Sequence, residues 1–175
     1  MREKNIVYIT VHTLTNIAVI IALAWFLVHS YLTTAEISGH SMEPVLSSGD
    51  LVLVDTLGYK FFHPNRMDVV IFRKNDSTDN VKRIVGLPGE TVTIQNGRIY
   101  IDGTLMENDK ISNISLAGVA EKPIKLTDDE YFLIGDNADS SEDSRFTNVG
   151  NIHRSQIIGK IWFRLLPTLK IGTIS

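Results

Sequence analysis

The sequence contains no cysteine in its 175 residues. This absence excludes disulfides, thiolate nucleophiles and zinc sites built on cysteine. The sequence also has no excess of basic residues, because 17 Lys and Arg stand against 20 Asp and Glu. The net charge of -3 does not favour binding to a phosphate backbone, so we expect no nucleic-acid partner.

Formal charges are also missing from residues 5–35. This segment contains the apolar run Ile17–Val28, and about 20 helical residues span the core of a bilayer. We therefore expect a transmembrane helix at residues 14–32, with the lipid bilayer as a partner. A cleaved signal peptide that ends near Ala35 is the alternative.

The distribution of positive charge predicts the orientation of this helix. Arg2 and Lys4 precede it, and the next cation is Lys60. Positive charges accumulate on the cytoplasmic side of a membrane helix. We therefore expect a single-pass protein of the cell membrane, with residues 1–13 in the cytoplasm and residues 36–175 outside it.

Residues 36–175 have the pattern of a β domain. The strongest local signal is the pair Asn96-Gly97 between two alternating segments, which supplies the positive φ angles of a two-residue type I′ turn. Further strand-like segments lie at residues 51–54, 68–72, 131–134 and 157–166. No segment after the membrane helix has a convincing 3.6-residue period. The expected fold is mostly β: an antiparallel β-barrel-like catalytic core with a small inserted subdomain at about residues 104–128, on one N-terminal transmembrane helix.

The stretch S-G-H-S-M-E-P-V-L, residues 38–46, raises the question of a serine nucleophile. A serine hydroxyl is a weak nucleophile and needs a base. His40 is a poor base for Ser41, because neighbouring side chains of an extended segment point to opposite faces. His63 and His153 lie in turn-like, polar surroundings typical of surface histidines. A Ser-His-Asp triad stays open, but no pattern points to it.

Lysine is the better candidate for the base. Residues 82–90 read K-R-I-V-G-L-P-G-E, so Lys82 enters an apolar strand that stops at a turn. The alternative is a lysine on an edge strand, where lysine is common. A lysine base must be neutral, so its pKa must fall from about 10.4 to roughly 7–8. That shift requires burial against apolar side chains with no carboxylate alongside.

An acidic stretch, G-D-N-A-D-S-S-E-D-S-R, occupies residues 135–145. A calcium loop is one interpretation, but an EF-hand needs Gly at position 6 and Glu at position 12. Counted from Asp136, these positions are Ser141 and Thr147. We therefore expect no metal and no cofactor. The other interpretation is a rigid loop in which Asp143 pairs with Arg145 and a serine points inward.

These stretches, in this order behind an apolar helix, resemble bacterial type I signal peptidases, which are Ser-Lys membrane proteases. The resemblance covers nearly the whole chain, and the single anchor and small insertion are similar to the compact Gram-positive form. It implies a serine endopeptidase that removes signal peptides from exported preproteins, with Ser41 as nucleophile and Lys82 as general base. It also implies substrates with Ala-x-Ala-like cleavage sites, and it allows the secretion translocon as a further partner.

The resemblance assigns supporting roles as well. Ser141 matches the serine that hydrogen-bonds and orients the lysine amine, Asp143 and Arg145 match a supporting ion pair, Asp136 helps to hold that loop, and Met42 matches the residue beside the nucleophile. Some members add a hydroxyl to the oxyanion hole at the position of Gly39, so backbone N–H groups or Ser38 would replace that donor here.

Three further positions depart from the usual pattern: Ala138 stands for arginine, Val45 for threonine and Glu90 for aspartate. Ala138 in particular raises the question of a looser loop. Some relatives have lost the dyad, so a catalytically weak or inactive protein that assists pilus or surface-protein assembly is the main alternative. A self-cleaving repressor-type protease and a membrane-anchored binding protein without enzymatic ancestry are two others.

Overall fold

The computed structural model describes residues 2–74 and 79–174, which divide into two compact units, Met1–Thr33 and Thr34–Ser175. The first unit consists of helix α1, Arg2–Tyr31. Within it, Tyr8–Phe26 is long and apolar enough to cross a membrane, and the side chains of this stretch are exposed. The helix thus begins well before residue 14, and Leu32 already belongs to a strand.

The second unit consists mainly of strands. They are β1 Leu32–Glu36, β2 Leu51–Asp55, β3 Val69–Phe72, β4 Asn80–Gly86, β5 Thr91–Gln95, β6 Arg98–Ile101, β7 Thr104–Leu105, β8 Ile124–Lys125, β9 Glu130–Ile134, β10 Ile152–His153, β11 Ile157–Leu166 and β12 Gly172–Thr173. All the strands expected from alternation are present. The short helix α2, Gly58–Phe61, was not expected, because four residues are too few to produce a helical period. Four 3-10 turns complete the chain: η1 Gly118–Glu121, η2 Ala138–Ser140, η3 Arg154–Gln156 and η4 Thr168–Lys170.

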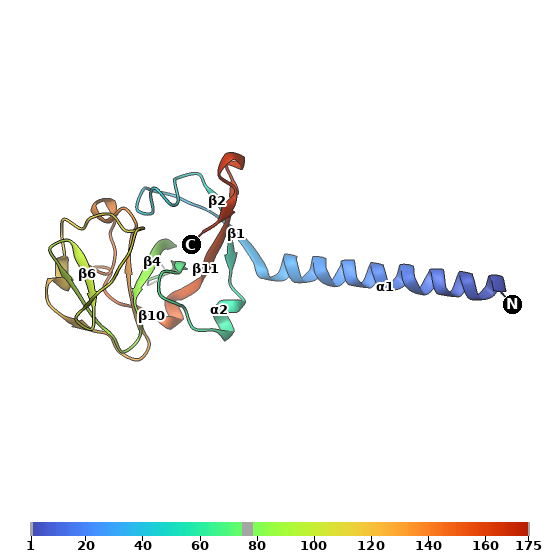
Figure 1. Ribbon diagram of the computed structural model, residues 1–175, viewed down its shortest axis with the longest axis horizontal. Coiled ribbons are helices and arrows are strands. Elements are labelled where there is room, and N and C mark those ends of the chain that lie inside the picture. The colour runs from blue at the N-terminus through green and yellow to red at the C-terminus, as the bar shows by residue number, and fades with distance from the viewer. Residues whose placement is uncertain (1, 75–78, 175) are drawn as a thin grey trace. The chain divides into compact units, whose positions relative to one another are not determined.

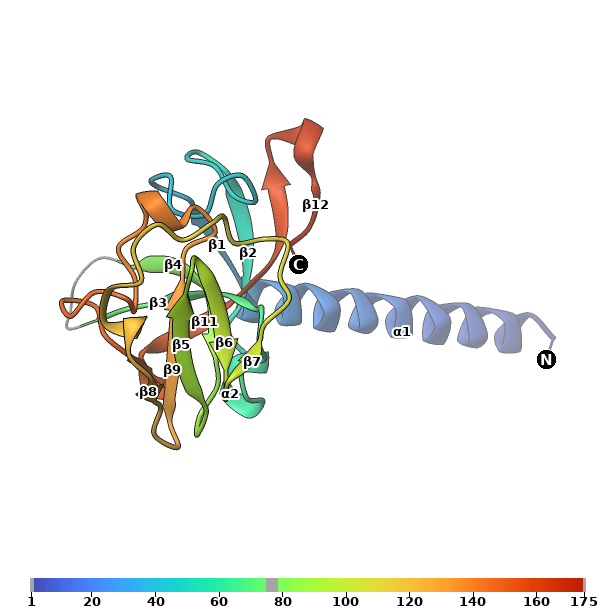
Figure 2. The same cartoon turned by 60° about the vertical axis from the view of Figure 1, so that its left-hand side comes forward.

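The strands form two sheets (Figures 1 and 2). The larger sheet has eight strands in the order β1-β2-β11-β3-β4-β9-β10, with β12 paired to β11. The smaller sheet has the order β7-β6-β5-β8. Irregularities along β11, where it pairs with β2 and β3, are of the kind that bends a strand. The expected mostly β, antiparallel fold is confirmed. The larger sheet is a curled half-barrel, with β1 and β10 at the two ends of its strand order.

Residues 104–128 contribute to the smaller sheet. Strand β7 pairs with β6, and β8 pairs with β5. Between these strands the segment covers residues 135–145: Ser112 N–H donates to Asp136 O at 2.8 Å, and Val119 N–H donates to Arg145 O at 2.9 Å. This segment therefore supports the acidic stretch directly.

Three buried apolar clusters stabilise the domain. One packs the smaller sheet against β9, through residues such as Val92, Ile94 and Phe132. A second joins β2, β3 and β11 and includes Met42 and Leu46, which are 2% and 0% exposed. Burial of a large apolar side chain stabilises by about 1.5–3 kcal/mol. The serine-containing stretch is thus anchored in the core by two of its own side chains.

The Asn96-Gly97 turn provides a test of this fold. Both residues have positive φ angles, as the sequence predicted, and a Cβ on Gly97 would collide with Asn113. Gly97→Ala is therefore expected to lower the free energy of unfolding by about 2 kcal/mol, and Gly103→Ala, which has positive φ but open space, by about 1 kcal/mol. Equilibrium denaturation of both variants measures the difference. Equal losses would contradict the packing described for residue 113.

Candidate active site

Ser41 lies on a loop that we call the serine loop, residues 37–50. Its base is closed by backbone hydrogen bonds from Ile37 N–H to Asp50 O at 2.9 Å and from Gly49 N–H to Ile37 O at 2.8 Å. Inside the loop, Leu46 N–H donates to Met42 O at 2.8 Å. Because Met42 and Leu46 are also buried in the core, the half-buried Ser41 is held on a fixed backbone.

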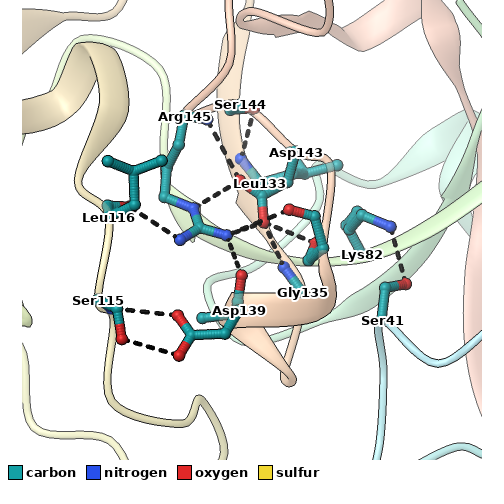
Figure 3. A network of polar contacts seen from close by, with 12 residues as sticks. Ser41, Lys82, Ser115, Leu116, Leu133, Gly135, Asp139, Asp143, Ser144 and Arg145 are labelled. Carbon is teal, nitrogen blue, oxygen red and sulfur yellow. Dashed lines mark hydrogen bonds and ion pairs between the residues drawn. The ribbon is translucent and has the colours of Figure 1, made fainter.

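Lys82 extends from strand β4 to this loop. Its Nζ lies 2.9 Å from Ser41 Oγ and donates a hydrogen bond to it, and Figure 3 shows the amine pointing at the hydroxyl. Lys82 is only 5% exposed. A cavity of about 240 Å³ opens beside the pair and is lined by Met42, Gly39 and Ile71 among others. The pair therefore joins a buried amine to a hydroxyl at the wall of a cleft.

Burial lowers the pKa of Lys82, because the ammonium form loses its hydration. Asp143 and Glu142 raise this pKa and Arg145 lowers it, each to a smaller extent than burial. The sequence predicted that the Lys82 amine has no carboxylate alongside, and this prediction is wrong. Desolvation nevertheless outweighs the carboxylates, and the guanidinium of Arg145 opposes them.

Arg145 and Asp143 form a buried ion pair in what we call the acidic loop, residues 135–145 (Figure 3). Arg145 Nε donates to Asp143 Oδ1 at 2.8 Å, and Nη2 donates to Oδ2 at 2.9 Å. Ser141 Oγ donates to the same carboxylate at 2.7 Å. A hydroxyl that donates in this direction keeps its lone pairs as acceptors. The expected hydrogen bond between Ser141 and Lys82 stays a prediction.

Asp136 holds the start of the acidic loop through Arg83. Both side chains are fully buried, and Arg83 Nε and Nη2 each donate to the Asp136 carboxylate at 2.7 Å. The backbone nearby reaches the serine loop, since Asn137 N–H donates to Ser41 O at 3.0 Å. Asp136 was expected in this loop, whereas a role for Arg83 was not expected, although Arg83 follows Lys82 directly in the sequence.

Gly135 is a second residue that sequence analysis missed. A Cβ at this position would lie 2.5 Å from Ser41 O and would also collide with Ser141. The two loops therefore approach each other so closely that only glycine fits between them. The chain order G-D-N at the end of a strand was the available signal, but the close approach is a tertiary feature.

Two departures from the family pattern have local explanations. Ala138 is 2% exposed and packs in an apolar cluster, and its carbonyl accepts a hydrogen bond from Arg145 at 2.5 Å. Gly39 has a φ of 92°, which L side chains rarely adopt. Within the described residues, the Ser41 N–H donates no hydrogen bond to the protein. It is therefore available as a donor to a developing oxyanion.

The histidines lie elsewhere. His40 is exposed and pairs with Glu43 at 3.0 Å, and His153 pairs with Asp129 at 3.0 Å. His63 is exposed. In the part of the chain that the structure describes, no group of three or more His, Asp or Glu side chains is arranged to hold a metal ion. Among the described residues, Lys82 is the titratable side chain that is hydrogen-bonded to Ser41.

Comparison with known proteins gives the family. The family described as "Signal peptidase, peptidase S26" matches residues 10–166. The chain belongs to this signal peptidase family. It is 32% identical to signal peptidase I of Leptolyngbya laminosa over 169 residues, covering 91% of this chain and 80% of the relative. It is 30% identical to signal peptidase IB of Staphylococcus aureus over 168 residues, covering 87% of each.

A solved structure of a signal peptidase I from Enterococcus faecalis also matches. It is 24% identical and aligns with 57% of this chain and 97% of that chain, at a TM-score of 0.47. Membership of the signal peptidase family identifies the protein as a peptidase and supports the removal of signal peptides as its function. Preproteins are the substrates that this membership implies.

Gly135→Ala tests the close approach of the two loops. Its Cβ would push Ser41 away from Lys82, so we expect cleavage of a preprotein to fall by about 100-fold. Gly103→Ala, in the turn between β6 and β7 where a Cβ meets nothing within 4 Å, is the control and should cleave normally. Activity is measured in detergent beside a melting curve. Normal turnover by a folded Gly135→Ala protein would contradict the described contact.

Proposed function

We propose that this signal peptidase family member is a membrane-anchored serine endopeptidase with a Ser41–Lys82 dyad. The 2.9 Å contact between Ser41 Oγ and the buried Lys82 Nζ carries the proposal. A hydroxyl needs a base within hydrogen-bond reach, and an amine acts as a base only when it is neutral. The lowered pKa of Lys82 supports that second condition.

The proton follows a short path in this mechanism. Neutral Lys82 accepts the proton of Ser41 across their contact while Oγ attacks the scissile carbonyl carbon. The Ser41 N–H donates to the oxyanion, an interaction often worth about 3–4 kcal/mol. The Lys82 ammonium then donates its proton to the leaving amine. Water then attacks the acyl carbonyl carbon while Lys82 accepts a proton from it, and the bond to Ser41 Oγ breaks as the Lys82 ammonium returns that proton to Oγ. This chemistry requires no cofactor.

The cleft beside Ser41 suits small apolar side chains. Its volume is about 240 Å³, and its apolar part is formed by Ala35, Ile37, Met42 and Ile71, beside polar lining residues such as Ser38 and Asn80. This supports preproteins with Ala-x-Ala-like cleavage sites as substrates. The secretion translocon is the partner that would deliver such preproteins to the enzyme.

Helix α1 supplies the proposed membrane anchor. The apolar segment Tyr8–Phe26 is long enough to span a bilayer core. Arg2 and Lys4 at its start favour a cytoplasmic N-terminus, with the catalytic domain outside the cytoplasm. Enzyme and substrate would then share one membrane, which raises the effective substrate concentration. A non-catalytic role in pilus or surface-protein assembly is not favoured by any contact at Ser41 or Lys82.

Removal of either dyad residue tests the assignment. Ser41→Ala and Lys82→Ala should each lower preprotein cleavage by at least about 10³-fold, because each removes a reacting group. Gel analysis of a preprotein in detergent or lipid measures the loss, with circular dichroism as the folding control. Substantial turnover by folded Lys82→Ala protein would exclude lysine as the base.

The pH dependence of cleavage tests the protonation state. Burial lowers the pKa of Lys82, so the fraction of neutral amine increases as pH rises through this lowered pKa. We therefore expect kcat/KM to fall on the acid side with a midpoint below the usual lysine pKa of about 10.4. Lys82→Arg should be inactive at every pH, since guanidinium does not deprotonate. An acid limb centred at the ordinary lysine value would contradict the proposed desolvation.

A further inference from the structure

Arg164 lies on β11, outside the dyad, and contacts the serine loop from the side. Its Nη1 donates to Val45 O at 2.8 Å and to Asp50 Oδ2 at 3.0 Å. Its Nε donates to Lys170 O at 2.7 Å. One guanidinium thus joins the serine loop to the C-terminal hairpin formed by the end of β11, η4 and β12.

These contacts complete the restraints on the serine loop. The base of the loop is closed by Ile37 and the Gly49-Asp50 backbone, and Met42 and Leu46 are buried in the core. Val45 belongs to the part of the serine loop that follows Ser41, residues 44–50, which we call the Val45 limb. Its carbonyl accepts a hydrogen bond from Arg164. The planar fork of arginine is suited to bind several oxygens at fixed angles, which an ammonium does not do.

Asp50 contributes to the same restraint. Its carboxylate is 4% exposed and accepts hydrogen bonds from Ser47 N–H at 3.0 Å and from Arg164. A buried carboxylate needs a compensating charge, so Arg164 neutralises Asp50 as well as holding the carbonyls. Charge compensation and positioning are therefore two separable roles of one side chain.

We propose that Arg164 is a positioning residue of the protease, which holds the Val45 limb of the serine loop so that Ser41 Oγ stays in contact with Lys82. The proposal rests on the proposed dyad mechanism. It makes the C-terminal hairpin part of the support of the site, because Lys170 O fixes the guanidinium from the other side. Small displacements of a nucleophile reduce turnover strongly while substrate binding continues.

The test separates the two roles of Arg164. Arg164→Met alone leaves the Asp50 charge buried and unpaired, and such a protein is prone to unfold. The double variant Arg164→Met/Asp50→Asn removes this charge. We expect it to fold and to show kcat about 10- to 100-fold lower, with KM changed by less than about twofold. Arg164→Lys, which keeps a charge for Asp50 without the planar fork, should also be folded and lowered in kcat.

Lys160→Met/Asp68→Asn is the matched control, because it also removes an ion pair between β11 and a buried carboxylate. Lys160 lies on the same strand and pairs with the buried Asp68 at 2.5 Å, away from the serine loop. This variant should lower the melting temperature and keep kcat. The midpoint of the acid limb of kcat/KM should stay unchanged in every Arg164 variant, because the burial of Lys82 is untouched.

Amide hydrogen exchange gives a readout that does not depend on activity. Leu46 N–H and Gly49 N–H should exchange faster in the Arg164→Met/Asp50→Asn variant and in Arg164→Lys than in Lys160→Met/Asp68→Asn. The proposal is overturned if the folded Arg164→Met/Asp50→Asn variant has wild-type kcat and unchanged exchange, or if Arg164→Lys has wild-type kcat and exchange. Arg164 would then serve only to compensate the charge of Asp50. Failure of the wild-type protein to cleave would instead contradict the dyad mechanism, and the exchange measurement would still decide the role of Arg164.

Discussion

An amine that is kept out of water is the constraint on which the site depends. Lys82 is 5% exposed, and its desolvation is the largest influence on its pKa. Carboxylates near such an amine would restore its proton, yet Asp143 lies in the adjacent loop. The ion pair between Asp143 and Arg145 opposes this effect. The Asp143 carboxylate accepts hydrogen bonds from the Arg145 guanidinium, the Ser141 hydroxyl and the Gly135 N–H. Asp136 and Asp143, the two buried carboxylates of the acidic loop, are therefore each paired with an arginine.

The geometry of the dyad depends on two loops that approach through their backbones. Ser41 O accepts a hydrogen bond from Asn137 N–H, and Gly135 leaves no room for a side chain beside it. The buried pair of Arg83 and Asp136 fixes the same segment to β4, the strand that carries Lys82. Ser41 and Lys82, the proposed nucleophile and base, are thus both linked to β4, in keeping with their contact of hydrogen-bond length.

Two of the departures from the family pattern, Val45 and Ala138, contribute backbone carbonyls to the loop contacts. Val45 takes part through its carbonyl, which Arg164 binds, so the nature of its side chain is of little consequence for that contact. Ala138 likewise contributes a carbonyl to Arg145, and its small side chain packs in the core. Glu90 still binds Arg66 and the Leu87 N–H at the turn after β4. All three residues thus take part in hydrogen bonds, Val45 and Ala138 through their carbonyls and Glu90 through its carboxylate.

The sequence by itself determined the local elements: alternation gave strands such as β5, β6 and β11, and Asn96-Gly97 gave the turn between two of them. These features depend on neighbouring residues, which a single chain displays directly. The motifs also indicated Ser41 and Lys82, 41 positions apart. The sequence also predicted the ion pair of Asp143 and Arg145. Only the tertiary structure decided that the side chains of Ser41 and Lys82 meet, that Gly135 separates the two loops, and that Arg83 and Arg164 hold them. Burial and contact between distant segments depend on how the sheets curl, and no local pattern of residues records that.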